Sequence, residues 1–213
     1  MLLEGTVNPP SNISFSDGAE PRLLAGKTAE LMVSGLHGNL YTATYRGFMY
    51  HGYLTTASAI PVTSTTSPTM ILWNPYGSGI NCVLVHYCLG WKAGTNVEGN
   101  VQLAVLPSVG DTIKDGAPIT AFTAGVTMNG MIGLGTVQKS KFGSAATVTA
   151  ATRFLPLGLN IMVMDTAKAT PVSLMYDFNG TVILPEGTAV FDVSSAATTA
   201  TYQRRLSWYE FPT

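Results

Sequence analysis

The sequence has few charged residues: Asp, Glu, Lys and Arg make up 11% of its 213 residues, whereas soluble domains average about 25%. The 11 basic and 12 acidic side chains nearly cancel, which leaves a formal net charge of −1. Proteins held on nucleic acid by phosphate contacts carry a basic patch or tail, so we expect no nucleic-acid partner. Apolar residues run along the whole chain, which argues against disorder.

Charged residues are absent from the stretch between Gly47 and Trp91. A membrane-spanning helix needs about 18 continuous apolar residues, and here Pro61, Pro68 and many Thr and Ser residues interrupt the run. The first residues lack the cationic start and apolar core of a secretory signal. We therefore expect neither a membrane partner nor a cleaved signal peptide.

Cysteine is also scarce, with only Cys82 and Cys88 in the chain. If both lie on one strand, they project from the same face about 20 Å apart, which is too far for a disulfide. Their spacing is not that of a zinc knuckle. We expect both to be small core residues.

Motifs for catalysis or cofactor binding are missing. The three histidines, His37, His51 and His86, lie in separate segments, and none has a second ligand at i+2 or i+4. The chain has no nucleophile elbow, P-loop or dinucleotide-binding loop. Asp177 and Glu210 lie next to aromatic residues, which leaves a sugar site as an alternative. We expect no enzymatic activity, no catalytic or metal-binding residue and no cofactor.

Short segments rich in Tyr, Thr, Val, Ile and Leu recur every 8–15 residues and predict about ten strands. Turns are predicted at Gly47 and Gly52, and the glycines of 125–143 predict a long loop. The strongest segment is 80–91, and the last is 202–211, where Leu206 and Trp208 share one face. The other expected strands are 40–50, 52–60, 69–73, 101–106, 119–122, 145–154, 159–164, 172–176, 181–184 and 189–193.

This pattern predicts an all-β fold: an antiparallel β-sandwich, jelly-roll-like, over residues 39–213. Residues 1–38 are rich in Pro, Gly and polar side chains, which predicts an extended N-terminal arm. An ordered arm must be buried against another surface, either of its own domain or of a neighbouring subunit.

The low charge further predicts that much of the surface is covered by neighbours, because interface cores are depleted in charged residues. A symmetric oligomer or a larger shell would supply them. Arg204 and Arg205 should point to opposite faces of one strand, and one of them should pair with an acid at an edge or a subunit contact. Our candidate interface residues are His37, Arg46, Asn129, Met131, Arg204 and Arg205.

Several segments resemble a family of structural proteins of tailed-phage virions. Residues 36–47 match the pattern L-H-G-x-x-Y-x-x-x-x-R-G, and residues 73–81 match x-N-P-x-G-S-G-x-N, a turn that precedes the longest strand. Residues 177–187 (D-F-N-G-T-V-I-L-P-E-G) and 207–212 (S-W-Y-E-F-P) fit as well. The similarity spans roughly residues 22–213.

The resemblance implies a β-sandwich component of the capsid and transfers no catalytic residue. We expect a capsid decoration or cement protein, assembled in the host cytoplasm into the virion. Its expected partners are the major capsid protein and copies of itself in a homotrimer. Two alternatives stay open: a single-jelly-roll major capsid protein, and a receptor- or glycan-binding tail or fibre module that uses Trp91, Tyr76 or Tyr209.

Overall fold

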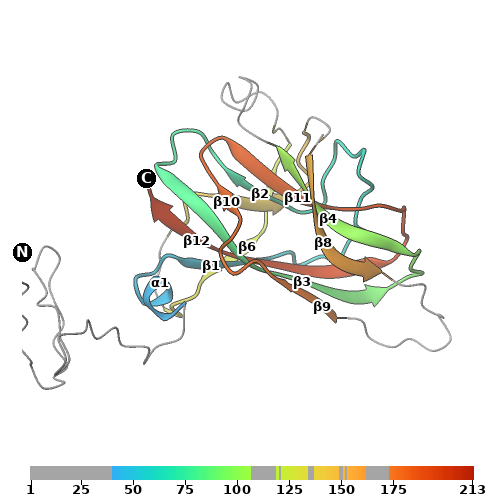
Figure 1. Ribbon diagram of the computed structural model, residues 1–213, viewed down its shortest axis with the longest axis horizontal. Coiled ribbons are helices and arrows are strands. Elements are labelled where there is room, and N and C mark those ends of the chain that lie inside the picture. Colours follow the sequence, from blue (N-terminus) through green and yellow to red (C-terminus); the bar gives the residue numbers. More distant parts are fainter. Residues whose placement is uncertain are drawn as a thin grey trace, which may run out of the picture. The chain divides into compact units, whose positions relative to one another are not determined.

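The computed structural model describes residues 40–106, 119, 121–133, 137–148, 151, 153–161 and 173–213. Almost all regular structure in them is β, arranged as two antiparallel sheets packed against each other (Figure 1). The predicted all-β antiparallel sandwich is therefore confirmed. Residues Ala43–Thr213 make up one compact unit. The arm predicted for 1–38 lies outside the described residues.

The first sheet, sheet I, has the strand order β10-β3-β12-β1-β6, and β9 pairs with β3 as well. Both β10 and β9 lie along the same edge of β3, opposite residues 82–83 and 86–90. Sheet I consists of β1 (Met49–Tyr53), β3 (Ile80–Ala93), β6 (Val126–Asn129), β9 (Ser173–Asp177), β10 (Ile183–Leu184) and β12 (Thr201–Pro212).

The second sheet, sheet II, has the strand order β5-β7-β2-β11-β4-β8. Its central strand β11 is buried along its whole length. Sheet II consists of β2 (Ile71–Asn74), β4 (Gly99–Leu106), β5 (Thr123–Ala124), β7 (Lys141–Ser144), β8 (Arg153–Ile161) and β11 (Thr188–Ser194).

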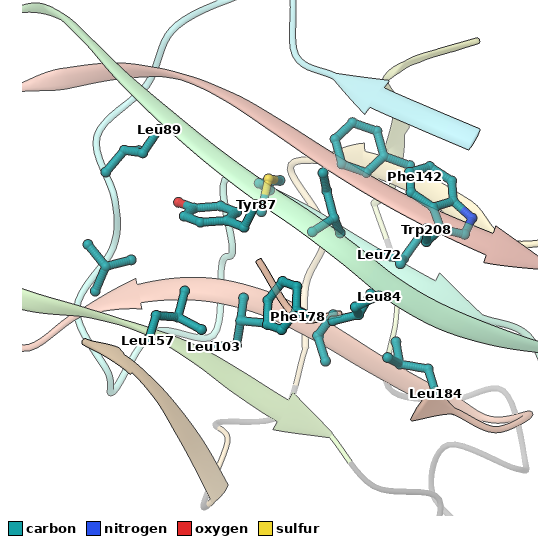
Figure 2. Packing of buried hydrophobic residues seen from close by; sticks show 14 of the residues in the cluster. Leu72, Leu84, Tyr87, Leu89, Leu103, Phe142, Leu157, Phe178, Leu184 and Trp208 are labelled. Atoms are coloured by element: carbon teal, nitrogen blue, oxygen red, sulfur yellow. The ribbon is translucent and has the colours of Figure 1, made fainter. Parts of the chain in front are cut away.

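The main core lies between the two sheets (Figure 2). Trp208 and Leu206 of β12 both point into it, as the alternation of that strand predicts. The Phe142 ring from sheet II stacks on Trp208 at a centroid distance of 5.8 Å. The Trp208 indole N–H donates to Ser140 Oγ at 2.9 Å, so the large buried ring leaves no polar atom unsatisfied.

The structure corrects the expectation of strand over 40–50. Residues Tyr41–Tyr45 form the short helix α1, and only from Met49 does the chain enter β1. Gly47, with φ of +75°, ends the helix. The amides of Gly47 and Phe48 donate to the carbonyls of Thr44 and Ala43, both at 2.9 Å, which is the Schellman pattern. The turn predicted at Gly47 is thus confirmed, but it terminates a helix.

The structure also corrects two predictions that were based on glycine: the turn at Gly52 and the long loop over 125–143. Gly52 lies within β1, while 125–143 contains β6 and the start of β7. β5 pairs with β7 in sheet II and β6 pairs with β1 in sheet I, so the chain changes sheets at Gly125. Conversely, the described residues of 145–151 are not in a strand, since β8 begins at Arg153, and the described residues of 119–122 form none.

The two cysteines lie on opposite faces of β3, which corrects the expected common face. The pairing with β12 skips Val85, so this extra residue forms a bulge and reverses the alternation beyond it. Cys82 therefore points into the core, whereas Cys88 points away from it and is partly exposed. Both thiols are free.

Two turns that carry the family resemblance contact each other. The Glu186 carboxylate accepts hydrogen bonds from the amides of Gly77 and Gly79, at 3.0 and 2.5 Å. The fully buried Asn74 side chain donates to the carbonyls of Ile80 and Leu184. Residues 74–79 and 185–187 therefore form one hydrogen-bonded unit at the end of the sandwich.

None of the described helices is long and apolar enough to cross a membrane.

Candidate functional site

The two sheets differ in how their outer faces are covered. Ile71, Ala104 and Phe191 on the outer face of sheet II belong to a second buried cluster, which includes Ile119, Ala146 and Val148 of the connecting segments. Sheet II is thus covered by its own chain. The described residues contain no comparable cluster over the centre of sheet I, so that face is the candidate functional surface.

The strand registers define this surface as two rows that run across five neighbouring strands. In each row the residues face one another in the order β6, β1, β12, β3, β9 (Figure 1). We call these ten residues the outer face. The first row is Val126, Tyr53, Arg205, Cys88 and Met175, and the second is Met128, His51, Ser207, His86 and Asp177.

Exposed apolar side chains are concentrated on sheet I. Met175 is 65% exposed and Met128 is 51% exposed, although methionine is a residue that normally fills cores. Among the strand residues whose side chains the structure describes, the exposed large apolar ones lie on sheet I except for Phe154 of sheet II. Those on sheet I are Tyr53, Val126, Met128, Met175, Ile183 and Phe211.

The second row contains two separate polar contacts. His51 Nδ1 lies 2.8 Å from Ser207 Oγ, and His86 Nδ1 lies 3.5 Å from Asp177 Oδ1. The pKa of His51 is lowered by burial and then by the positive charges of Arg205 and His86. The neutral imidazole is therefore favoured, which keeps the row low in charge at neutral pH.

This order of Asp, His and Ser resembles a hydrolytic triad, but the geometry does not support nucleophilic catalysis. Ser207 is completely buried, and its hydroxyl is engaged with His51, whereas a nucleophile must reach its substrate. The second row instead holds neighbouring strands together.

Arg205 lines a shallow recess in the first row. The recess has a volume of about 430 Å³ and is bordered by Tyr53, Cys88, Gly90 and Gln203. The absence of a side chain at Gly90 leaves room beside the guanidinium. Within the part of the chain that the structure describes, no carboxylate lies within ion-pair distance of Arg205.

Arg204 lies on the other side of the strand, inside the sandwich. Its guanidinium contacts both oxygens of Asp192, at 3.0 and 2.9 Å, and both side chains are fully buried. It also donates to Thr69 and Ser58, while the Tyr87 hydroxyl donates to Asp192. Burial, then the Asp192 charge, raises the pKa of Tyr87 well above its ordinary value. This network joins β12 of sheet I to β11 of sheet II.

The six candidate interface residues are therefore not one cluster. Arg204 and Arg205 do point to opposite faces, as predicted, but the acid partner of Arg204 is in the interior and not at an edge. Arg205 lies on the outer face, Arg46 and Met131 are exposed, and His37 lies outside the described residues.

Asn129 is buried, and its side chain forms hydrogen bonds with backbone groups. Its Nδ2 donates to the carbonyl of Gly47 at 2.6 Å, and its Oδ1 accepts from the amide of Met131 at 2.8 Å. It thereby fixes the turn after α1 to the end of β6, close to Arg46 in the chain.

The alternative sugar site at Asp177 and Glu210 lacks a pair of facing carboxylates. Asp177 is on the outer face, whereas Glu210 is buried and accepts hydrogen bonds from the amides of Lys139 and Ser140 and from Ser140 Oγ, at 2.9, 2.9 and 2.6 Å. Glu210 holds the segment before β7 in place. The described residues contain no group of three or more His, Cys, Asp and Glu that could hold a metal ion.

Sequence reasoning missed most of the outer face. Alternation within 201–212 places Gln203, Arg205, Ser207, Tyr209 and Phe211 on one side, which was a usable signal. Met128 falls in the loop that the glycines of 125–143 predict but lies in β6, and the sequence gives no sign of the bulge at Val85 that turns Cys88 outwards.

Comparison with known proteins provides no identification. The sequence matches no protein-family model. No curated protein matches it either.

Proposed function

We propose that this protein is a structural component of a tailed-phage virion that decorates or cements the capsid shell through protein–protein contacts. The observation that carries the proposal is the outer face of sheet I: five strands wide, rich in exposed apolar side chains and containing only Arg205 and Asp177 from the set Asp, Glu, Lys and Arg. Such a composition is typical of a buried interface. The resemblance of the turn motifs to virion proteins supports the phage assignment.

A contact of this kind depends on burial of apolar surface and on uncharged hydrogen bonds. Salt screens exposed charges strongly but has little effect on such interactions. Attachment to the particle should therefore persist in concentrated salt.

The test uses purified particles that contain the chain. We expect it to stay bound through washes in molar NaCl at neutral pH, as followed by quantitative mass spectrometry of the pellet and the supernatant. Release in salt contradicts the proposal. Met175→Glu should reduce occupancy, because it places a charge in the contact, while Phe154→Glu on sheet II serves as a matched control with little effect.

Copy number separates decoration from the alternative of a single-jelly-roll major capsid protein. A shell-forming chain must be the most abundant protein of the particle, whereas a decoration protein accompanies another, equally or more abundant shell protein. Quantification of stained bands from the same particles decides between these roles.

The glycan-binding alternative has less support. Trp91 packs against the core, while Tyr209 lies on the opposite side of sheet I, since it alternates with the buried Trp208. These two rings cannot form one stacking platform for a sugar.

A further inference from the structure

Two histidines lie in the second row of the outer face, one on each side of β12. His51 on β1 and His86 on β3 pair with Ser207 from opposite sides, and His86 also pairs with Asp177 on β9. Both histidines are partly buried. Histidine changes its charge between about pH 5 and pH 8, so the charge of this surface depends on pH where Arg and Asp do not titrate.

His86 is placed to offset the one acid of the outer face. Its Nδ1 is buried, finds no hydrogen-bond partner among the described residues and lies 3.5 Å from Asp177 Oδ1. A proton on this nitrogen faces the carboxylate, so protonated His86 cancels the charge of Asp177. Arg205 then has no opposing charge on the outer face.

His51 has a different environment. Its Nδ1 lies 2.8 Å from Ser207 Oγ, and no acid of the described residues is within ion-pair distance of its ring. Asp177 is three strands away, or about 14 Å. Burial, followed by the positive charges of Arg205 and His86, lowers the pKa of His51. Protonation of His51 therefore adds a charge that no neighbour compensates.

The other titratable groups that face the histidines do not oppose this change. They are Tyr53 on β1, Cys88 on β3 and Tyr209 on β12, while β6 contributes apolar side chains. Burial, then the charge of Asp177, raises the pKa of Tyr209, which keeps this phenol neutral. Thiols and phenols gain no charge in acid, so acidification makes the outer face positive.

We infer that the outer face is an acid-sensitive contact surface, which holds its partner while His51 and His86 are neutral and releases it when both are protonated. The inference rests on the proposed function, since it takes the capsid shell as the partner. At neutral pH the charges of Arg205 and Asp177 cancel over the surface, whereas two added protons leave it with a net positive charge. Burial of such unpaired charge in an apolar contact is unfavourable.

Proton linkage sets the direction of the effect. An apolar partner that covers the two imidazoles disfavours their charged form, so the attached chain binds fewer protons in mild acid than the free chain does. A state that binds fewer protons loses stability as the pH falls. Attachment is therefore strongest above about pH 7 and weakens as the pH falls through the range in which histidines titrate.

The test uses particles that lack the chain and are loaded with the purified full-length chain. Its affinity for the particles is measured by co-sedimentation at two pH values in the same salt. We expect attachment to be at least roughly tenfold weaker at about pH 5 than at about pH 7.5, since each pKa unit of difference between the attached and the free chain changes the affinity tenfold. Equal affinity at both pH values overturns the inference.

Variants assign the effect to the two histidines. Asparagine cannot be protonated and keeps a hydrogen-bonding group near Nδ1, so we use His51→Asn, His86→Asn and the double variant. The quantity compared is the ratio of the affinities at the two pH values, which should approach one in the double variant. His37→Asn removes the third histidine of the chain and should keep the full ratio. A ratio that falls only with His37→Asn, or with no variant, overturns the inference.

A second measurement needs no particle. Proton NMR of the free chain follows the imidazole of His51, whose pKa should lie below its ordinary value and should rise in Arg205→Met, because a neighbouring positive charge is removed. Arg153→Met, at an exposed position of β8 in sheet II, is the matched control and should leave the pKa of His51 unchanged. A pKa at or above the ordinary value overturns the charge coupling and the inference with it.

These outcomes separate the inference from the proposed function. A chain that attaches at neutral pH, resists salt and stays attached in acid overturns the acid-sensitive contact and leaves the capsid role standing. A chain that does not attach to particles at neutral pH overturns the capsid role, and the acid-sensitive contact with the shell is rejected with it.

Discussion

At the scale of single residues, the packing around Phe142 shows what two glycines contribute. A Cβ atom built on Gly52 would lie 2.7 Å from the Phe142 ring, and one on Gly125 would lie 2.8 Å from it. The ring is held between these two backbone segments and Trp208, on which it stacks. Glycine is required here by the closeness of the backbone to an aromatic ring and not by a turn.

Gly52→Ala and Gly125→Ala should therefore each lower the free energy of unfolding, by about 1–3 kcal/mol, because overpacking forces the ring or a strand to shift. Urea unfolding followed by tryptophan fluorescence measures this. Gly90→Ala is the control, since its Cβ would meet only the Gln203 carbonyl at 3.9 Å. Equal stability of all three variants would show that Phe142 can move at no cost.

At the scale of elements, two polar links connect parts of the chain that are far apart in sequence. Glu186 joins the turn before β11 to the turn before β3. The Arg204–Asp192 pair joins the facing strands β12 and β11 across the core. Each link uses a charged group, in a chain that has few, to satisfy buried or constrained polar groups.

Glu186→Ala should destabilise the sandwich by about 1.5–3 kcal/mol, because two backbone amides lose a charged acceptor. Thermal unfolding by calorimetry and hydrogen exchange at Gly77 and Gly79 report the change. Glu98→Ala, at an exposed acid before β4, should have little effect. A loss of the same size at both positions would point to net charge as the cause.

The buried ion pair can be tested by a double-mutant cycle. Arg204→Met or Asp192→Leu alone should cost about 3–5 kcal/mol, since each leaves an uncompensated charge in the core. The double variant should cost less than the sum of the two, because neither charge remains. Denaturant unfolding of all four proteins gives the coupling energy, and strict additivity would contradict a direct interaction.

At the scale of the whole molecule, both buried clusters are built from residues between Met49 and Trp208. The sandwich therefore contains its own cores. Among the described residues, buried clusters cover both faces of sheet II and one face of sheet I, so we assign intermolecular contacts to the other face of sheet I.

Deleting residues 1–30 should leave the sandwich folded, with an unfolding midpoint close to that of the full chain, and should weaken attachment to the particle several-fold. Circular dichroism melting and a particle-binding assay measure the two effects separately. Full occupancy by the truncated chain would exclude a role of the arm in attachment, and loss of cooperative unfolding would show that the cores need it.

Much of this fold could be predicted from the sequence. The strands at 80–91, 101–106, 172–176, 189–193 and 202–211 were predicted close to their observed positions, because their apolar and β-branched residues form continuous segments between turn residues. Where glycine and threonine carried the signal, as in 40–50 and 125–143, local propensity was outweighed by contacts with distant residues.

The sequence by itself determined the all-β class, the low charge and the alternation that sends Arg204 and Arg205 to opposite sides. These properties depend on composition and on residues that are close in the chain, so they can be inferred from the sequence alone. Only the tertiary structure decided that Arg204 is buried with Asp192, that Cys88 faces outwards and that the described segments cover the outer face of sheet II but not that of sheet I. Such features depend on which strands pair, where a bulge shifts the register and which segments cover a sheet, and these are contacts between residues far apart in the chain.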